Sequence, residues 1–426
     1  MKTKDSKSSS GCQGVQTLAN GLRVVLVPCE AESVAVGVFI KSGSRHEPPE
    51  FAGISHLIEH MLFKGTPTRR AIDISREIEG CGGRFNAMTG EEATVYYTHL
   101  PDDHLADAVD VLSDMYLRAT IPDDDFVREK QVVIEEIKMY ADDPGSVAME
   151  NLQRALFKGS TLGEPIAGTP ESLAPLRPAD LRRYIRSHYR ADNTIVIVVG
   201  SFDPGAALAL VERAFSPLKH AKNPPSAKLP RLPRHSPSHV SVEKDVQQTQ
   251  LALGCRMFGA GDPRKYAVTV LNAVLGGGMS SRLFQEIREK RGLSYDIASR
   301  VNLFDDAGMF TVAAGLDSSK AEQVVATIDR EFARICERRV PAAELRRTKD
   351  FLIGNFKLTH ESVMGKLLFY GNAMLAFGRA MPPSEQIDGI RAVTPSDLQS
   401  LARAVFAPAN RSVSWVVPRI EAKGAQ

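Results

Sequence analysis

The sequence has little of what marks several common classes of protein. Only five of its 426 residues are cysteines, an odd number, and no two of them form a CxxC pair. This pattern argues against a disulfide framework and against a zinc site built from thiolates, and it fits a reducing compartment. No stretch approaches 18 uninterrupted apolar residues, so we expect no transmembrane helix.

An excess of charge of one sign is also lacking. The 53 basic and 51 acidic residues leave a net charge of +2, which is too small to attract nucleic acid or a membrane surface. Residues 1–14 are rich in Lys and Ser, but the apolar segment of a secretory signal does not follow them. We therefore expect a cytoplasmic protein that has neither a nucleic-acid nor a membrane partner.

The length and composition predict two globular domains. With 43% hydrophobic residues the chain can build substantial cores, and 426 residues exceed what one core usually serves. A segment rich in Pro, Lys, Arg and Ser, 217–238, has the composition of a linker. We therefore place one domain at 15–216 and a second at 239–420.

The two domains show the same order of predicted elements. The first has two strands before its helices, then a third strand, more helices, and an apolar strand that completes its sheet. The predicted strands are 22–27, 34–40, 94–100 and 194–199, and the helices 51–63, 71–79, 104–118 and 123–140. After the linker, strands in 240–255, a helix over 263–275, a helix ending at Lys290 and strands up to Leu316 repeat this order at a shift of about 209 residues. We expect an α+β protein with two homologous α/β-sandwich domains, each a mostly antiparallel sheet covered by helices, which face each other as a clamshell.

The segment His56-Leu57-Ile58-Glu59-His60 is the clearest chemical signal. Two histidines at positions i and i+4 lie on one face of a helix, so their imidazoles can bind one zinc ion. Glu59 shares that face and can take a proton from water. The other eight histidines have no spacing typical of metal ligands.

A catalytic zinc site needs a third protein ligand, and the helix predicted over 123–140 offers candidates. Glu129 and Glu136 are seven residues apart, so they point in nearly the same direction. One could bind the metal while the other orients a histidine. The residues alone are equally consistent with the acidic edge of an amphipathic helix.

The segments HLIEHMLFKGT and VVIEEIKMY resemble the pitrilysin/insulinase family of zinc metallopeptidases, in particular its short branch, which includes the mitochondrial processing peptidase β subunit. The reversed HxxEH order is that of inverzincins. The resemblance implies Zn²⁺ as cofactor, with His56, His60 and Glu136 as its ligands, since Glu136 follows His60 at the family's spacing of about 76 residues. It implies Glu59 as general base and Glu129 as the residue that orients a ligating histidine.

Two further segments resemble substrate-binding parts of the family. GGRFNAMT resembles the segment that leads into an edge strand along the bound peptide, which implies that Asn86 and Ala87 contact substrate. A Gly-rich turn accounts for the same residues. RLFQEIREKRGLSY resembles the family's arginine/tyrosine element, which implies that Arg288 and Tyr295 hold the peptide near the scissile bond. A helix end capped by Gly292 is the plainer interpretation.

Together these features predict a zinc metalloendopeptidase that hydrolyses unfolded peptides or presequence-like segments inside an enclosed chamber. In the short branch of the family two chains form the chamber, and each active site combines the zinc of one chain with the arginine/tyrosine element of the other. We therefore expect a homodimer. The alternatives are a non-catalytic peptide-binding or assembly subunit of the same family, and an acid/base enzyme that uses no metal.

Overall fold

The computed structural model describes residues 14–220, 229 and 231–419. Residues 221–228 and 230 of the predicted linker, 217–238, lie outside these residues, and the domain limits that depend on the linker stay a prediction. The chain forms two compact units, and each takes segments from both halves of the sequence. Unit 1 contains the described residues up to Ile134, with Ile166–Leu229 and Lys357–Pro382; unit 2 contains Glu135–Pro165, Pro230–Phe356 and the residues from Pro383 onward.

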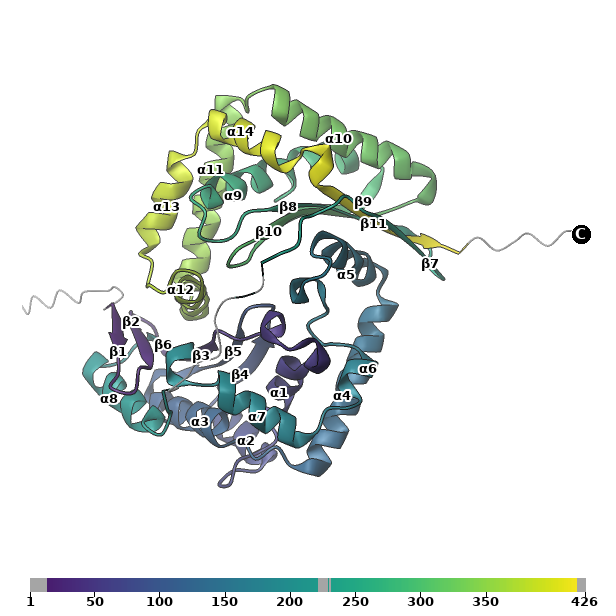
Figure 1. The fold of residues 1–426 in the computed structure, drawn as a ribbon. Helices are drawn as coiled ribbons and strands as arrows, with labels where there is room; N and C mark the ends of the chain where they lie inside the picture. Colours follow the sequence, from purple (N-terminus) through teal and green to yellow (C-terminus); the bar gives the residue numbers. More distant parts are fainter. Residues whose placement is uncertain (1–13, 221–228, 230, 420–426) are drawn as a thin grey trace, which may run out of the picture. The chain divides into compact units, whose positions relative to one another are not determined.

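Unit 1 is built on a six-stranded sheet with the order β1-β2-β6-β3-β5-β4 (Figure 1). Its neighbouring strands are antiparallel except β2 and β6, which are parallel. The strands are β1 (Val15–Thr17), β2 (Arg23–Pro28), β3 (Ser33–Ile40), β4 (Arg84–Thr89), β5 (Thr94–Pro101) and β6 (Thr194–Gly200). The predicted strand 194–199 is β6, and it lies inside the sheet between β2 and β3. All seven of its residues are buried, as its continuous apolar sequence requires.

Unit 2 repeats this topology. Its five strands have the order β7-β11-β8-β10-β9, which matches β2-β6-β3-β5-β4 strand for strand. Its one parallel pair, β7 and β11, corresponds to the parallel pair of unit 1. The strands are β7 (His239–Lys244), β8 (Thr249–Met257), β9 (Ser294–Leu303), β10 (Gly308–Leu316) and β11 (Arg411–Pro418). The α+β class, the mostly antiparallel sheets and the internal repeat are therefore confirmed.

Helices cover both sheets. Those with all or most of their residues in unit 1 are α1 (Ile54–Leu62), α2 (Ala71–Gly80), α3 (Leu105–Arg118), α4 (Asp123–Asp142), α6 (Pro170–Leu173), α7 (Pro178–His188), α8 (Pro204–Phe215) and α12 (Val363–Phe377). Those of unit 2 are α5 (Pro144–Leu156), α9 (Lys265–Leu275), α10 (Ala321–Glu337), α11 (Ala342–Glu361), α13 (Pro383–Ala392), α14 (Pro395–Val405) and the π-helix η6 (Phe284–Glu289). Among the described residues, no helix is both long and apolar enough to span a membrane.

The two units exchange one helix each. Helix α12 comes from the second half of the sequence but packs on the sheet of unit 1, where Leu367, Tyr370 and Met374 join a core with residues of β2, β3 and β6. Helix α5 comes from the first half but packs on the sheet of unit 2, where Leu152 and Leu156 join a core with residues of β8 and β11. The two helices occupy equivalent places in the repeat, directly after α4 and α11.

Candidate metal centre

Helix α1 carries the HxxEH segment in unit 1. Its apolar residues are fully buried and fix the helix against the core: Ile54, Leu57, Ile58, Met61 and Leu62 are at most 1% exposed. The two histidines lie one turn apart on the remaining face, with ring centroids 4.8 Å from each other. The predicted start of this helix at Phe51 was too early, because Pro49–Phe51 form a separate turn of 3₁₀ helix and α1 begins at Ile54.

The N-terminus of α1 is held by the buried carboxylate of Glu47. One carboxylate oxygen accepts a hydrogen bond from the backbone N–H of Gly53 and the other from that of Ser55, both at 2.7 Å. These N–H groups lie at the start of the helix and would otherwise lack partners inside it. Burial raises the pKa of Glu47 to about 7, against the opposing effect of these hydrogen bonds. Gly53 itself has φ +92°, and a Cβ there would lie 2.5 Å from the carbonyl oxygen of Ala167.

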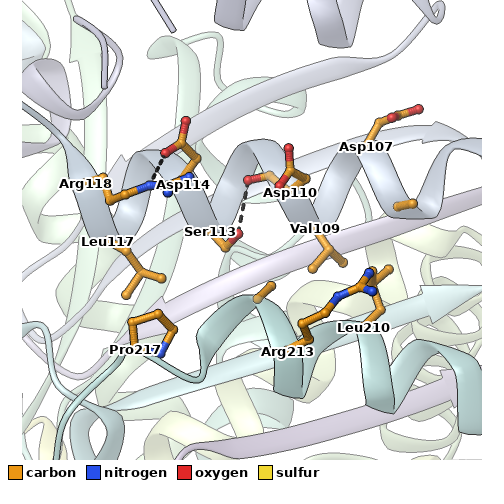
Figure 2. Close-up of a pocket in the computed structure, with 12 residues that line it drawn as sticks. Asp107, Val109, Asp110, Ser113, Asp114, Leu117, Arg118, Leu210, Arg213 and Pro217 are labelled. Atoms are coloured by element: carbon orange, nitrogen blue, oxygen red, sulfur yellow. Dashed lines mark hydrogen bonds and ion pairs between the residues drawn. The ribbon is translucent and has the colours of Figure 1, made fainter. Parts of the chain in front are cut away.

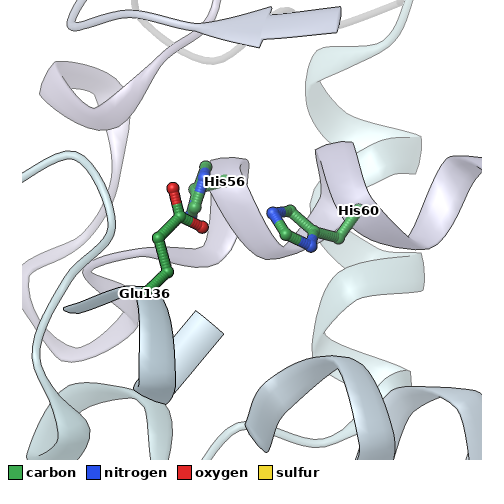
Figure 3. A group of neighbouring side chains, drawn as sticks. All are labelled: His56, His60 and Glu136. Atoms are coloured by element: carbon green, nitrogen blue, oxygen red, sulfur yellow. The ribbon is translucent and has the colours of Figure 1, made fainter. Parts of the chain in front are cut away.

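Helix α4 brings the distant carboxylate to the histidine pair. Potential ligand atoms of His56, His60 and Glu136 all lie within 4.8 Å of one another, and Figure 3 shows the carboxylate directed towards the two imidazoles. Most of α4 belongs to unit 1, and Glu136 follows Ile134, the last residue of that stretch, on the same continuous helix. The neighbouring Glu135 points elsewhere and forms an exposed ion pair with Lys138 at 2.8 Å.

Glu129 lies two turns before Glu136 on α4 and contacts the histidine pair from the side. Its Oε2 atom is 3.1 Å from Nδ1 of His60, and its Oε1 atom is 2.6 Å from Nζ of Lys64. A carboxylate on one ring nitrogen fixes the orientation of the imidazole and leaves the other nitrogen for a metal. The position of Glu129 is therefore the one that an orienting residue needs.

The donor set fits zinc. Two imidazole nitrogens and one carboxylate oxygen are ligands that Zn²⁺ prefers, and a set of three leaves a position for water. At metal–ligand distances of about 2.1 Å, two ligands of one ion are at most about 4.2 Å apart. Small side-chain rotations would bring the observed atoms, which lie within 4.8 Å of one another, to that geometry. His56, His60 and Glu136 are thus the residues that would hold the ion.

Glu59 lies on α1, directly before His60, and its carboxylate is held by a hydroxyl group. The Oγ1 atom of Thr89 donates a hydrogen bond of 2.5 Å to Oε2 of Glu59. Thr89 is the last residue of β4, so the contact connects α1, which carries the histidine pair, to the edge strand of the sheet. Neither Thr89 nor Glu47 was identified from the sequence. Thr89 contacts a residue 30 positions away along the chain, and Glu47 contacts N–H groups six and eight positions after it, outside any N-cap pattern.

Asn86 and Ala87 lie on strand β4 itself. The strand pairs with β5 on one side and ends the order of the sheet on the other. Asn86 is exposed and Ala87 half-buried, as expected for alternating residues of an edge strand. The Gly-rich turn, Gly82-Gly83, precedes the strand.

Arg288 and Tyr295 lie together in unit 2. Arg288 is on η6 and Tyr295 is the second residue of β9, the edge strand that corresponds to β4. The guanidinium carbon of Arg288 is 4.7 Å from the centroid of the Tyr295 ring, within the range of a cation–π contact. The Tyr295 residue is 80% exposed, so its hydroxyl group is accessible to a ligand.

Comparison with known proteins gives the same family as the sequence motifs. Residues 23–170 match the family model described as insulinase (peptidase family M16), and residues 175–352 match the one described as peptidase M16 inactive domain. An uncharacterized zinc protease of Bacillus subtilis is 37% identical over 391 residues, which cover 92% of this chain and 95% of the relative. The chain belongs to peptidase family M16. Two further relatives are also named as uncharacterized zinc proteases. The one from Streptomyces coelicolor is 35% identical over 92% of this chain and 86% of the relative. The one from Rickettsia felis is 34% identical over 92% of this chain and 94% of the relative.

Solved structures show the same fold. A protease from Helicobacter pylori superimposes with a TM-score of 0.90 at 24% identity, over 95% of this chain and 99% of the other. A structure from Pseudomonas fluorescens described as a peptidase M16 inactive domain gives 0.88 at 22% identity, over 97% of this chain and 99% of the other. The predicted resemblance to the pitrilysin/insulinase family is confirmed, and the names of the relatives support zinc as the cofactor of this M16 protein.

Proposed function

We propose that this protein is a zinc-dependent endopeptidase in which His56, His60 and Glu136 hold the metal and Glu59 is the general base. The observation that carries the proposal is the convergence of the three ligand atoms, brought together from α1 and α4. Glu59 adds a carboxylate on the same helix as the histidines. The names of the M16 relatives support the same assignment.

The chemistry needs a base, an oriented metal site and a place for the peptide. Zinc bound here would polarise the scissile carbonyl and make water more acidic. Glu59 takes the proton of the attacking water and delivers it to the leaving amine. Thr89 holds the carboxylate of Glu59, and Glu129 holds the imidazole of His60. The Thr89 hydroxyl as donor and the Glu129 carboxylate as acceptor thereby fix both groups before substrate binds.

The substrates we propose are unfolded peptides or presequence-like segments. The edge of β4 offers backbone groups to a peptide, with Asn86 and Ala87 along it, and pairing with this edge requires an extended backbone, which an unfolded segment can adopt. In unit 2 the exposed hydroxyl group of Tyr295 and the guanidinium of Arg288 are donors suited to the carbonyl oxygen as it becomes negatively charged.

Cleavage of a quenched fluorescent peptide by Glu59→Gln tests the proposal. We expect kcat to fall by about 100-fold or more, the usual contribution of a general base, while the zinc content stays that of the wild type. Glu135→Gln is the matched control, because its carboxylate is exposed and pairs with Lys138, and it should retain activity. A chelator should abolish wild-type cleavage. Normal activity of zinc-loaded Glu59→Gln contradicts the proposed base, and peptide binding without any cleavage indicates the non-catalytic alternative.

We also propose that two copies of the chain assemble, with the zinc of one and the arginine/tyrosine element of the other forming each active site. Mixing inactive Glu59→Gln with an inactive double variant, Arg288→Ala with Tyr295→Phe, tests this arrangement. Each mixed dimer would contain one intact site, so random exchange restores about a quarter of wild-type activity. If each chain supplies its own site, the mixture stays inactive.

A further inference from the structure

A second group of metal-binding side chains lies in unit 1, on elements other than those of the histidine pair. Cys81 follows the last residue of α2, His104 precedes the first residue of α3, and Asp107 lies in the first turn of α3. Potential ligand atoms of the three residues, one from each, lie within 4.8 Å of one another. The sequence argued against a thiolate site because the five cysteines are odd in number and include no CxxC pair, and a site with a single cysteine needs no such pair.

We propose that Cys81, His104 and Asp107 form a second binding site for a divalent cation of the zinc type. A thiolate, an imidazole and a carboxylate together suit Zn²⁺, Co²⁺ and similar ions better than Mg²⁺ or Ca²⁺, which prefer oxygen ligands alone. The three protein ligands leave at least one position for water. The proposal is independent of the peptidase function.

The ligands are partly oriented by contacts within the protein. Oδ2 of Asp107 is 2.7 Å from Nδ1 of His104, a hydrogen bond that holds both side chains at one place. This separation is close to that of two ligands on one small cation, since bonds of about 2.1 Å at a tetrahedral angle place ligands roughly 3.4 Å apart. Oδ2 of Asp107 and Nδ1 of His104 need to move only slightly apart for both to bind one ion.

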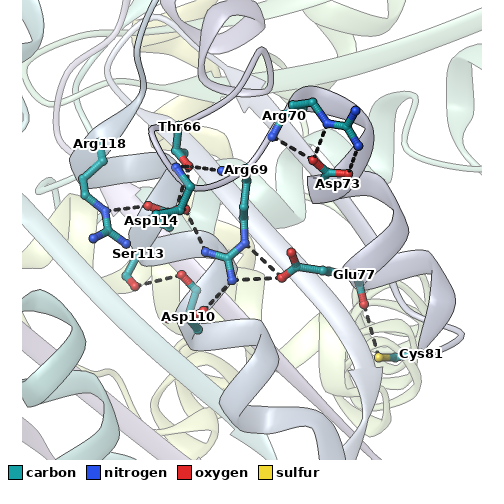
Figure 4. A network of polar contacts seen from close by, with 11 residues as sticks. Thr66, Arg69, Arg70, Asp73, Glu77, Cys81, Asp110, Ser113, Asp114 and Arg118 are labelled. Carbon is teal, nitrogen blue, oxygen red and sulfur yellow. Dashed lines mark hydrogen bonds and ion pairs between the residues drawn. The ribbon is translucent and has the colours of Figure 1, made fainter.

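The helices that carry the ligands are fixed to one another by a polar network (Figure 4). Arg69, just before α2, contacts Glu77 on α2 and both Asp110 and Asp114 on α3. The end of α2 is therefore tied to α3. The network also engages the carboxylate of Glu77, whose backbone oxygen lies 3.2 Å from the thiol of Cys81. The thiol of Cys81 thus has a fixed hydrogen-bond acceptor, and a metal ion that binds the sulfur would displace the thiol proton.

The site is open to solvent and to hydrated ions. The side chains of His104 and Asp107 are 34% and 54% exposed. Asp107 also lines a surface pocket between α3 and α8, which Figure 2 shows along the face of α3. A second carboxylate is close by, since Oδ1 of Asp103 is 3.7 Å from Nε2 of His104. Negative charge around the three ligands favours a cation.

An ion in this place would brace the start of the proposed peptide-binding strand. Cys81 is three residues before Arg84, the first residue of β4, while Thr89 at the other end of β4 contacts Glu59. Five residue steps of a strand span roughly 17 Å. The second site is thus well separated from the histidine pair and can be loaded independently of it.

Titration with Co²⁺ tests the proposal, because a thiolate ligand on cobalt gives a charge-transfer band in the near ultraviolet that imidazole and carboxylate ligands do not give. We expect wild-type protein freed of metal to bind two Co²⁺ per chain and to show this band. Cys81→Ser should bind one Co²⁺ and lose the band, and His104→Gln should bind cobalt at this site at least about tenfold more weakly. Cys29→Ser, which removes another half-buried thiol of unit 1, should behave as the wild type.

A double variant, His56→Ala with His60→Ala, separates this proposal from the proposed function. It should lose one Co²⁺ but keep the thiolate band. Absence of the band in wild-type protein, or its persistence in folded Cys81→Ser, overturns the proposal. Alkylation of Cys81 by iodoacetamide should also be slowed by Co²⁺. Equal rates with and without cobalt would identify a merely reactive thiol beside an imidazole and would count against the site.

Discussion

A single hydroxyl group connects the proposed general base to the edge strand. Thr89 donates to Glu59, and it does so from the last position of β4. The hydrogen bond restricts the carboxylate to one orientation without adding a charge beside it. The geometry of the base therefore depends on how β4 is placed.

Replacing Thr89 by Val removes the hydroxyl group but keeps the shape of the side chain. We expect kcat to fall about tenfold, because the carboxylate of Glu59 loses its fixed position, while KM and zinc content change little. Thr89→Ser should restore most of the rate. The measurement is steady-state cleavage of a quenched peptide beside metal analysis, and an unchanged kcat for Thr89→Val would show that Thr89 is only structural.

Glu47 makes folding stability sensitive to pH. Burial raises the pKa of its carboxyl group in the folded protein to about 7, from the ordinary value of 4.5 for a glutamate. The folded state thus retains a proton that the unfolded chain releases, so the free energy of unfolding should fall as pH rises from about 4.5 to 7, by roughly 3 kcal/mol at most. Urea unfolding at pH 5, 6, 7 and 8 measures this slope. Glu47→Gln should flatten it, and equal slopes in both proteins would refute the assignment.

The sequence indicated the candidate site residues that a local pattern marks and missed the contacts that only the fold brings together. Spacing alone places His56 and His60 on one face, and the structure confirms that their rings meet. The choice of Glu136 over Glu135 rested on the family resemblance, and the structure separates the two by their contacts. Cys81 and His104 are distant in sequence and belong to no motif, so their proximity could be seen only in the structure.

At the scale of elements, the polar network that connects α2 to α3 depends on one buried carboxylate. Asp114 has a fully buried side chain and accepts hydrogen bonds from Thr66, Thr68, Arg69 and Arg118. Burial alone would raise the pKa of Asp114, but these hydrogen bonds outweigh it and lower the pKa. The hydrogen bonds to Asp114 hold Thr66 and Thr68, which follow α1, and thereby fix the chain at the C-terminal end of α1.

Asp114→Asn should lower the free energy of unfolding by about 3 kcal/mol, because Arg69 would lose the only fully buried one of its three carboxylate partners. Asp110→Asn is the matched control. It removes a contact of the same arginine, but the Asp110 side chain is 63% exposed, so the loss should stay below about 1 kcal/mol. Urea denaturation followed by circular dichroism measures both. Similar losses for the two variants would argue against a special role for the buried carboxylate.

Element types were predicted best where periodicity was strong. The helices over 71–79 and 123–140 and the strand over 94–100 agree with the structure to within two residues. The continuous apolar sequence of β6 indicates a strand that is buried on both faces and thus lies inside the sheet. The pattern of apolar and polar residues along the chain does not tell which strands are its neighbours. The segment with Asn86 and Ala87 was expected to lead into an edge strand, with a Gly-rich turn as the alternative, and both residues already lie on β4.

At the scale of the molecule, the exchange of α5 and α12 was not visible in the sequence. Helix α5 is amphipathic and α12 is largely apolar, and neither pattern tells which sheet the helix covers. Only the tertiary structure shows that Leu367, Tyr370 and Met374, all at most 3% exposed, complete the core of unit 1. The homodimer, the cytoplasmic location and the linker limits stay predictions at this scale.

A shortened chain that ends at Leu229 should fail to fold cooperatively. It lacks α12, and loss of three buried side chains at roughly 2 kcal/mol each is comparable to the whole stability of a domain. Adding a peptide that spans 357–382 should restore a sharp thermal transition. The same peptide with Leu367→Asp and Met374→Asp serves as the control and should have no effect. Cooperative melting of the shortened chain by itself would contradict this expectation.

The reciprocal positions of α5 and α12 also bear on how such a molecule could arise. A single ancestral repeat would have lacked a helix of its own at the place that α5 and α12 take, so the helix of a second chain would have had to cover that part of its sheet. Joining two copies end to end turns this exchange of helices between two molecules into an exchange within one molecule. A duplicated gene would then inherit a working fold at once, and one copy could lose its metal ligands without loss of structure.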